Sequence, residues 1–142
     1  MKSLLPVLFA ILAGIFTTIE TGINAKLGKL MTPNMATLHN LVTGVIFILL
    51  INLFRGTLYQ YKPIIYISPQ WLVGGLFGAL IVYFATRSVP ELGISRALTI
   101  IVAAQLISSL FIDTVILDKQ QLDWYKLSGI VLLLIGTYFI IK

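Results

Sequence analysis

The stretch SLLPVLFAILAGIFTTIETGIN, residues 3–24, decides the fold class of this chain, and Glu20 is the only charged residue within it. An apolar run of about 20 residues is long enough to cross a bilayer as a helix. Because lipid offers no hydrogen-bonding partners, the backbone groups of such a segment must bond to each other, as they do in a helix. Residues 3–24 therefore predict a transmembrane helix. Lys2 and the apolar run also suggest a signal peptide, but no convincing cleavage site follows, so we expect the helix to be retained.

Four further apolar runs follow, separated by turn-forming and basic residues. Thr32-Pro33-Asn34 breaks the chain after the first run, Arg55-Gly56 stops the second, and Arg87 and Pro90 stop the third. We predict an all-α integral membrane protein with five transmembrane helices in one domain, residues 1–142. The expected spans are residues 3–24, 35–54, 70–88, 93–117 and 124–141.

Composition supports a membrane location and excludes several functions. Hydrophobic residues make up 58% of the 142 positions and charged residues 11%, against about 25% charged in soluble domains. The net charge of +5 comes from basic residues that punctuate the apolar runs, which suits membrane topology and anionic headgroups rather than nucleic acid. Cysteine is absent and His39 is the single histidine. No phosphate loop, nucleophile–base pair or metal-ligand spacing occurs, so we expect no enzyme, cofactor or metal.

Aromatic residues occur where the membrane surface is expected. Trp71 opens the third predicted span, Trp124 and Tyr125 open the fifth, and Tyr138 lies near its end. Such amphipathic rings prefer the headgroup region. We expect the segment from Tyr59 to Tyr66 to lie along the membrane surface.

Positive charges are balanced between the two sides of the membrane. With five spans, one side carries five basic residues and the other side also carries five. An excess of Lys and Arg in cytoplasmic loops normally sets orientation. Two interpretations are open: both orientations occur and two copies pair antiparallel, or another feature fixes one orientation. The two sets are Lys2, Arg55, Lys62, Lys119 and Lys126, and Lys26, Lys29, Arg87, Arg96 and Lys142.

Polar residues in the first two spans are candidates for a binding site, because such residues are costly in a membrane. Thr17, Glu20 and Asn24 share one helix face by their spacing. Glu20 could bind a cation or carry a proton, or it could lie near the headgroups or pair with a neighbour such as His39. Asn40 suits an interhelical hydrogen bond.

The fourth span carries a polar stripe in an otherwise apolar helix. Ser108 and Ser109 lie three and four residues after Gln105, and Asp113 lies a further turn along. The stripe suits the lining of a wet cavity, or a seam between helices. Inverting one copy would bring Glu20 of one protomer to the depth of Asp113 in its partner, so both carboxylates could surround one cavity.

Gly74 and Gly78 form a GxxxG pattern in the third span. Small residues let membrane helices approach closely. The pattern indicates helix packing, either within one protomer or at a dimer seam.

Several segments of the chain resemble the YdcZ-like five-helix proteins of the drug/metabolite transporter superfamily. Asn24, Leu27 and Gly28 match the family's Gln-x-x-x-Asn-x-x-Leu-Gly pattern, with Glu20 where Gln is common. The most specific match is AQLISSLFID, residues 104–113, which contains Gln105 and Asp113. The other matching segments are NLVTG (40–44), WLVGGLFGA (71–79) and VPELGIS (89–95).

This resemblance implies a secondary transporter in the bacterial cytoplasmic (inner) membrane, half of an inverted-repeat transporter of about ten helices. Its expected partners are a second copy in an antiparallel homodimer, or a related five-helix chain, together with the bilayer and an unidentified small metabolite or cation. We expect alternating access around Thr17, Glu20, Asn24, Asn40, Gln105, Ser108, Ser109 and Asp113.

Three other functions stay open. Small multidrug resistance proteins export cations through a glutamate in their first helix, but the comparable mid-span positions here are Ala13-Gly14. A passive ion channel is the second, and high unitary conductance would distinguish it from a carrier. A non-transporting membrane subunit is the third.

Overall fold

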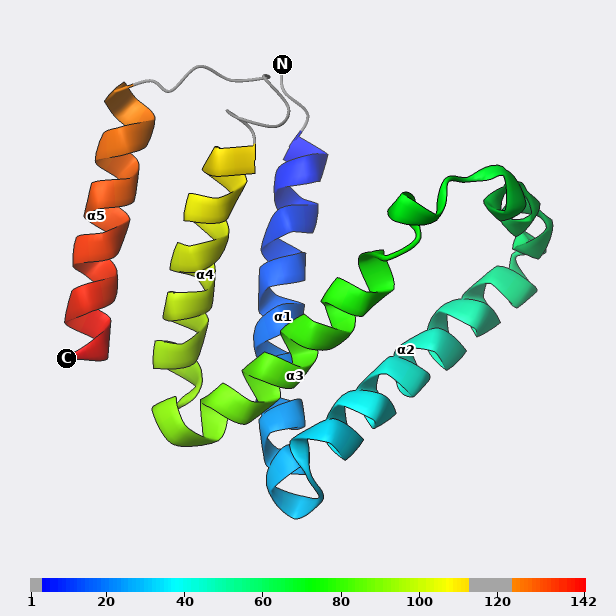
Figure 1. Cartoon of the computed structure of the whole chain (residues 1–142), viewed down its shortest axis with the longest axis horizontal. Helices are drawn as coiled ribbons and strands as arrows, with labels where there is room; N and C mark the ends of the chain where they lie inside the picture. The colour runs from blue at the N-terminus through cyan, green and yellow to red at the C-terminus, as the bar shows by residue number, and fades with distance from the viewer. Residues whose placement is uncertain (1–3, 113–123) are drawn as a thin grey trace. The chain divides into compact units, whose positions relative to one another are not determined.

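The computed structural model describes residues 4–112 and 124–142 (Figure 1). Within these residues the chain is helical, without strands, and five helices are long and apolar enough to cross a membrane. The all-α membrane fold is thereby confirmed. The α-helices are α1 Leu4–Leu30, α2 Pro33–Phe54, α3 Gly74–Leu92, α4 Ile94–Phe111 and α5 Trp124–Ile141, and the 3-10 helices are η1 Leu58–Tyr66 and η2 Pro69–Trp71. The chain divides into two compact units, Met1–Glu91 and Leu92–Lys142.

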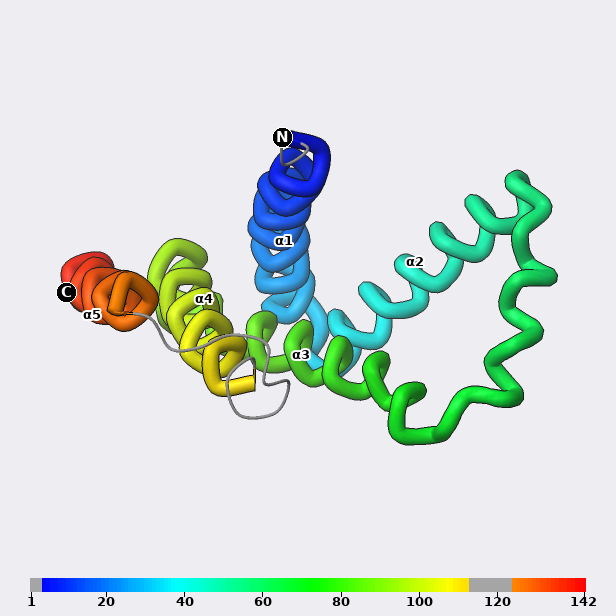
Figure 2. The backbone as a smooth tube through the Cα atoms, turned by 90° about the horizontal axis from the view of Figure 1, so that it is seen from above, coloured from blue at the N-terminus to red at the C-terminus, as the bar shows by residue number. Residues whose placement is uncertain are grey.

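Helices α1 and α2 of the first unit form a helical hairpin. The Thr32 hydroxyl accepts a hydrogen bond from the Met35 amide at 3.2 Å, and Pro33 occupies the first turn of α2. A side-chain acceptor at the cap and a proline in the first turn are both favourable helix starts. The two helices meet at this turn and diverge away from it (Figures 1 and 2).

A glycine-based cap ends α2. Gly56 has a φ of +62°, and its amide donates to the Leu53 carbonyl at 3.1 Å. The Thr57 amide donates to the Asn52 carbonyl at 3.0 Å. This pair of bonds is a Schellman motif, which satisfies carbonyls left open at a helix end. The predicted stop at Arg55-Gly56 is therefore present, and the cap turns the chain into η1.

The buried side chains of the first unit are small. The closest approach is at Gly28 of α1, where an added Cβ would lie 2.6 Å from Cγ2 of Thr86 in α3. Small residues permit such contacts between membrane helices, while most large apolar side chains of this unit are exposed. The buried residues of this unit are Thr21, Asn24, Ala25, Ala36, Thr37, Ala85, Thr86 and Val89.

Two helices extend beyond the spans expected from the sequence. Helix α1 continues past Asn24 to Leu30, with Lys26 and Lys29 inside it. Lysine is a good helix former, and a cation near a helix C-terminus is favourable. Helix α3 begins at Gly74, after η2, and runs past Arg87 and Pro90 to Leu92. Pro90 lies in the last turn of α3 and supplies no amide donor to the preceding turn, and the helix ends two residues later.

The second unit consists of α4 and α5, which pack side by side (Figures 1 and 2). Gly93 precedes α4 with a φ of +81°, a conformation that glycine adopts without steric cost. The buried side chains are again small: Ala97 and Ala103 on α4, and Thr137 on α5.

Candidate functional site

A groove of about 490 Å³ lies between α1 and α2 and combines apolar walls with polar groups. The apolar residues come from α1 at spacings of three and four, which place them on one helix face. The groove is contained within two membrane-spanning helices of one unit. Its lining residues are Phe16, Ile19, Glu20, Ile23, Asn24, Leu27, His39, Asn40 and Thr43.

A hydrogen bond between Glu20 and Asn40 joins the two helices at this groove. The Asn40 Nδ2 amide donates to Glu20 Oε1 at 2.8 Å. Asn40 thus makes the kind of interhelical bond that its sequence position suggests. His39 was one of the neighbours considered as a partner for Glu20. The structure instead has the Asn40 amide against the carboxylate, and His39 lines the groove as well.

The Glu20 carboxylate keeps acceptor capacity. An ionised carboxylate has two oxygens and about four acceptor positions. Among the described residues, Asn40 supplies the one side-chain donor seen at Oε1. A ligand in the groove with a cationic or hydrogen-bond-donating group could therefore bind this carboxylate.

The remaining polar candidates of the first unit differ in whether they line the groove. Asn24 lines the groove and is only 4% exposed. Thr17 is not among the lining residues, and its hydroxyl donates to the Ala13 carbonyl at 2.8 Å. The Thr43 hydroxyl donates in the same way to the His39 carbonyl. The structure thus brings Glu20, Asn24 and Asn40 together and leaves Thr17 outside the groove.

The apolar wall is the part of the groove that was not predicted from the sequence. Phe16, Ile23 and Leu27 are apolar residues of a kind that lipid also accommodates, so nothing in their chemistry marks them as groove residues. Their spacing from Glu20 does indicate that they lie beside it, since positions four before, three after and seven after a residue share its helix face.

The polar stripe of α4 lies in the second unit. Gln105, Ser108 and Ser109 are exposed, and the Ser109 hydroxyl donates to the Leu106 carbonyl at 2.9 Å. Asp113, the fourth member, lies outside the described residues. In the described parts of the chain, no group of three or more metal-ligating side chains occurs.

A comparison with protein families matches nearly the whole chain. Residues 5–139 match the family described as "Putative inner membrane exporter, YdcZ". No curated protein and no solved structure matches the chain. The family match agrees with five membrane-length helices and with the resemblance seen in the sequence. The chain therefore belongs to the YdcZ family and is a multi-pass protein of the inner membrane.

Proposed function

We propose that this chain is a half-size secondary transporter that moves a small metabolite or cation by alternating access, as a dual-topology antiparallel homodimer. One observation carries the proposal: the Glu20 carboxylate lines an open groove between two membrane-spanning helices. The family description as an exporter supports the transport role.

The chemistry of the groove favours a small cation with an apolar part. A carboxylate within a membrane span is costly, so such residues commonly mark an ion or substrate path. Glu20 supplies charge, Asn24 and Asn40 supply amides, and the wall around them is apolar. Binding sites for small molecules usually combine apolar walls with a few polar groups in this way.

Symmetry supports the antiparallel arrangement. Inverted-repeat transporters bind substrate near the midplane, at the interface of two halves related by an axis in the membrane plane. An antiparallel pair of five-helix chains would have the same symmetry. Balanced basic residues remove the usual bias toward one orientation. In such a dimer, Gln105 and Asp113 of one copy could share a cavity with Glu20 of the other.

The test is transport by purified protein in proteoliposomes. Guanidinium, tetramethylammonium and benzylammonium serve as probes, and solid-supported-membrane currents report their movement. We expect saturable current with at least one probe, and a loss of more than about tenfold, or 1.4 kcal/mol, in Glu20→Gln.

Thr18→Ala is the matched control, because the Thr18 hydroxyl donates to the Gly14 carbonyl of its own helix and Thr18 does not line the groove. This control should transport like the wild type. Unchanged transport in Glu20→Gln, or unsaturable high conductance, would contradict the proposal.

A further inference from the structure

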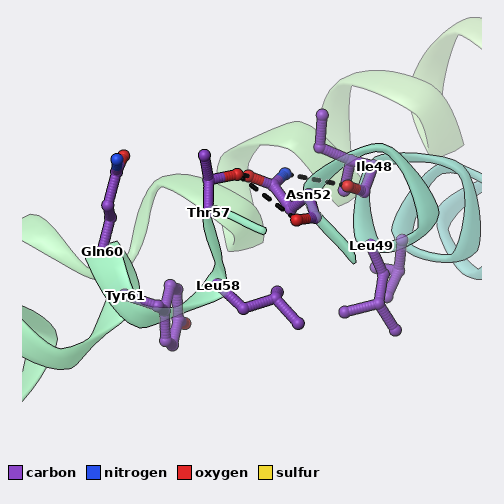
Figure 3. Close-up of a pocket in the computed structure, with 8 residues that line it drawn as sticks. Ile48, Leu49, Asn52, Thr57, Leu58, Gln60 and Tyr61 are labelled. Carbon is purple, nitrogen blue, oxygen red and sulfur yellow. Dashed lines mark hydrogen bonds between the residues drawn. The ribbon is translucent and has the colours of Figure 1, made fainter. Parts of the chain in front are cut away.

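A second groove lies where α2 ends and η1 begins. Its volume is about 660 Å³, within the roughly 300–1,000 Å³ typical of small-molecule sites. Figure 3 shows Leu49, Leu58 and Tyr61 on one side of the backbone. The lining residues are Val45, Ile48, Leu49, Asn52, Thr57, Leu58, Gln60 and Tyr61.

The polar groups of Asn52 and Thr57 in this groove are paired with each other and with the backbone. The Thr57 hydroxyl donates to Asn52 Oδ1 at 2.8 Å (Figure 3). The Asn52 Nδ2 amide donates to the Ile48 carbonyl at 2.8 Å. These bonds use much of the polar capacity of the wall. The Gln60 amide and the Tyr61 hydroxyl are the other polar groups of the wall, and the remaining lining residues, from Val45 to Leu49 on α2 and Leu58 on η1, are aliphatic.

The groove lies at the end of a membrane-spanning helix. Helix α2 stops at Phe54, and η1 follows with Tyr59, Tyr61 and Tyr66 exposed. Tyrosine is enriched at the level of lipid headgroups. The aromatic and basic residues of this segment also predict that it lies at the membrane surface. A ligand here would have its apolar part beside the span and its polar part at the headgroup level.

Two basic residues are close in sequence to the groove-lining residues. Arg55 lies between Asn52 and Thr57 in the chain, Lys62 follows Tyr61, and both side chains are exposed. No Asp or Glu occurs from residue 21 to residue 90. Basic residues close to a span attract anionic lipids.

We propose that this groove binds an anionic phospholipid of the surrounding bilayer. One acyl chain lies against Ile48, Leu49 and Leu58, and the phosphate lies beside Arg55 and Lys62. A lipid matches the aliphatic part of this wall with its acyl chain and the nearby basic residues with its phosphate, while Gln60 and Tyr61 lie at the level of its polar head. The site is separate from the Glu20 groove, and lipid binding here does not require transport.

The experiment compares lipid binding by purified, delipidated full-length protein. Phosphatidylglycerol and phosphatidylcholine with identical acyl chains are added at equal molar ratio, and native mass spectrometry counts bound lipids. We expect at least fivefold more phosphatidylglycerol than phosphatidylcholine on the wild type. Arg55→Gln/Lys62→Gln should reduce this ratio below twofold. Leu58→Trp, which fills the groove, should lower binding of both lipids.

Lys26→Gln/Lys29→Gln is the matched control, because it removes two exposed basic side chains from α1, away from this groove. It should keep the wild-type ratio. Equal binding of the two lipids by the wild type, or an equal loss of preference in the control, would overturn the proposal. Displacement of phosphatidylglycerol by an equal concentration of inorganic phosphate would also overturn it, since that result indicates a site for a free anion. If the Arg55→Gln/Lys62→Gln protein aggregates, Lys62→Gln alone makes the same comparison.

Discussion

At the residue scale, the contact of Gly28 with Thr86 sets how closely α1 approaches α3. A Cβ at position 28 would lie 2.6 Å from Thr86 Cγ2, well inside van der Waals contact. Thr86 is 1% exposed, so its side chain has little room to move. Its Oγ1 has no hydrogen-bond partner among the described residues. The position therefore serves close packing rather than polar pairing.

We expect Gly28→Ala to destabilise the protein by about 1–3 kcal/mol, the usual cost of overpacking a close contact. Thr86→Ala should restore much of this loss, because it removes Cγ2 and with it the clash. The measurement is the unfolding midpoint in detergent with increasing sodium dodecyl sulfate, followed by circular dichroism.

Gly14→Ala is the control for the helix propensity of alanine, since Gly14 lies in the same helix and an added Cβ meets nothing within 4 Å. It should be neutral or more stable, by up to about 1 kcal/mol. Equal loss in Gly14→Ala and Gly28→Ala, or no rescue by Thr86→Ala, would show that the contact is not the cause.

The residues of the Glu20 groove could be predicted from sequence only in part. Glu20, Asn24 and Asn40 are identifiable because polar side chains are rare in apolar spans. The choice of Asn40 over His39 as the partner of Glu20 depends on how α2 is rotated against α1, which neighbouring positions in the sequence do not encode. Gly28 matched a family pattern. Its contact with Thr86 was not predictable, because that contact also depends on how one helix packs against another.

At the element scale, hydropathy predicts that helices exist but is a weaker guide to where they end. Helix α2 ends as predicted because Gly56 provides a local stop signal. Helix α1 runs past the expected end because lysine is a good helix former, and α3 ends at Leu92, within one turn after Pro90. A span ends where the lipid ends, whereas a helix ends where its hydrogen bonding ends.

Gly74 and Gly78 of α3 make no close helix–helix contact within the first unit. An added Cβ at Gly74 or Gly78 would meet no described atom of the first unit within 4 Å, so this GxxxG face is not packed within that unit, while Gly28 makes the close contact. Of the two interpretations left by the sequence, the dimer seam is therefore the one we propose. We expect Gly74→Leu/Gly78→Leu to shift purified protein from dimer toward monomer by at least fivefold in the dissociation constant, measured by fluorescence energy transfer in detergent.

Gly129→Leu provides the comparison for this prediction, since Gly129 on α5 is equally open and lies outside the GxxxG pattern. It should dimerise like the wild type. A Gly74→Leu/Gly78→Leu protein that dimerises normally would place the seam on another face.

At the scale of the whole molecule, the balanced charges and the five-helix fold support the proposed antiparallel homodimer. Each protomer exposes polar side chains on membrane-length helices, including Glu20 and Gln105, which lipid would not favour. In the proposed dimer a second copy would cover these groups, and an inverted copy would bring its Asp113 to the depth of Glu20. Assembly of this kind needs both orientations of one chain in one membrane.

Shifting the charge balance should therefore separate the two orientations. Leu30→Lys/Met31→Lys adds two basic residues to the connection between α1 and α2, and Ser68→Lys/Gln70→Lys adds two to the connection between α2 and α3, on the other side of the membrane. Each variant should insert mainly one way, because the excess of Lys and Arg fixes the cytoplasmic side. Labelling of single cysteines at Asn34 and Gln60 from each side of intact cells reports the orientation.

Each charge variant expressed alone should lose transport of the guanidinium, tetramethylammonium or benzylammonium probe that the wild type moves, because its copies face the same way. Expression of both together should restore transport, since opposite orientations then meet in one membrane. Glu20→Gln in both variants is the control and should abolish the restored flux. Full transport by either variant alone would show that a parallel assembly or a single protomer suffices, because inverted symmetry cannot form from copies with one orientation.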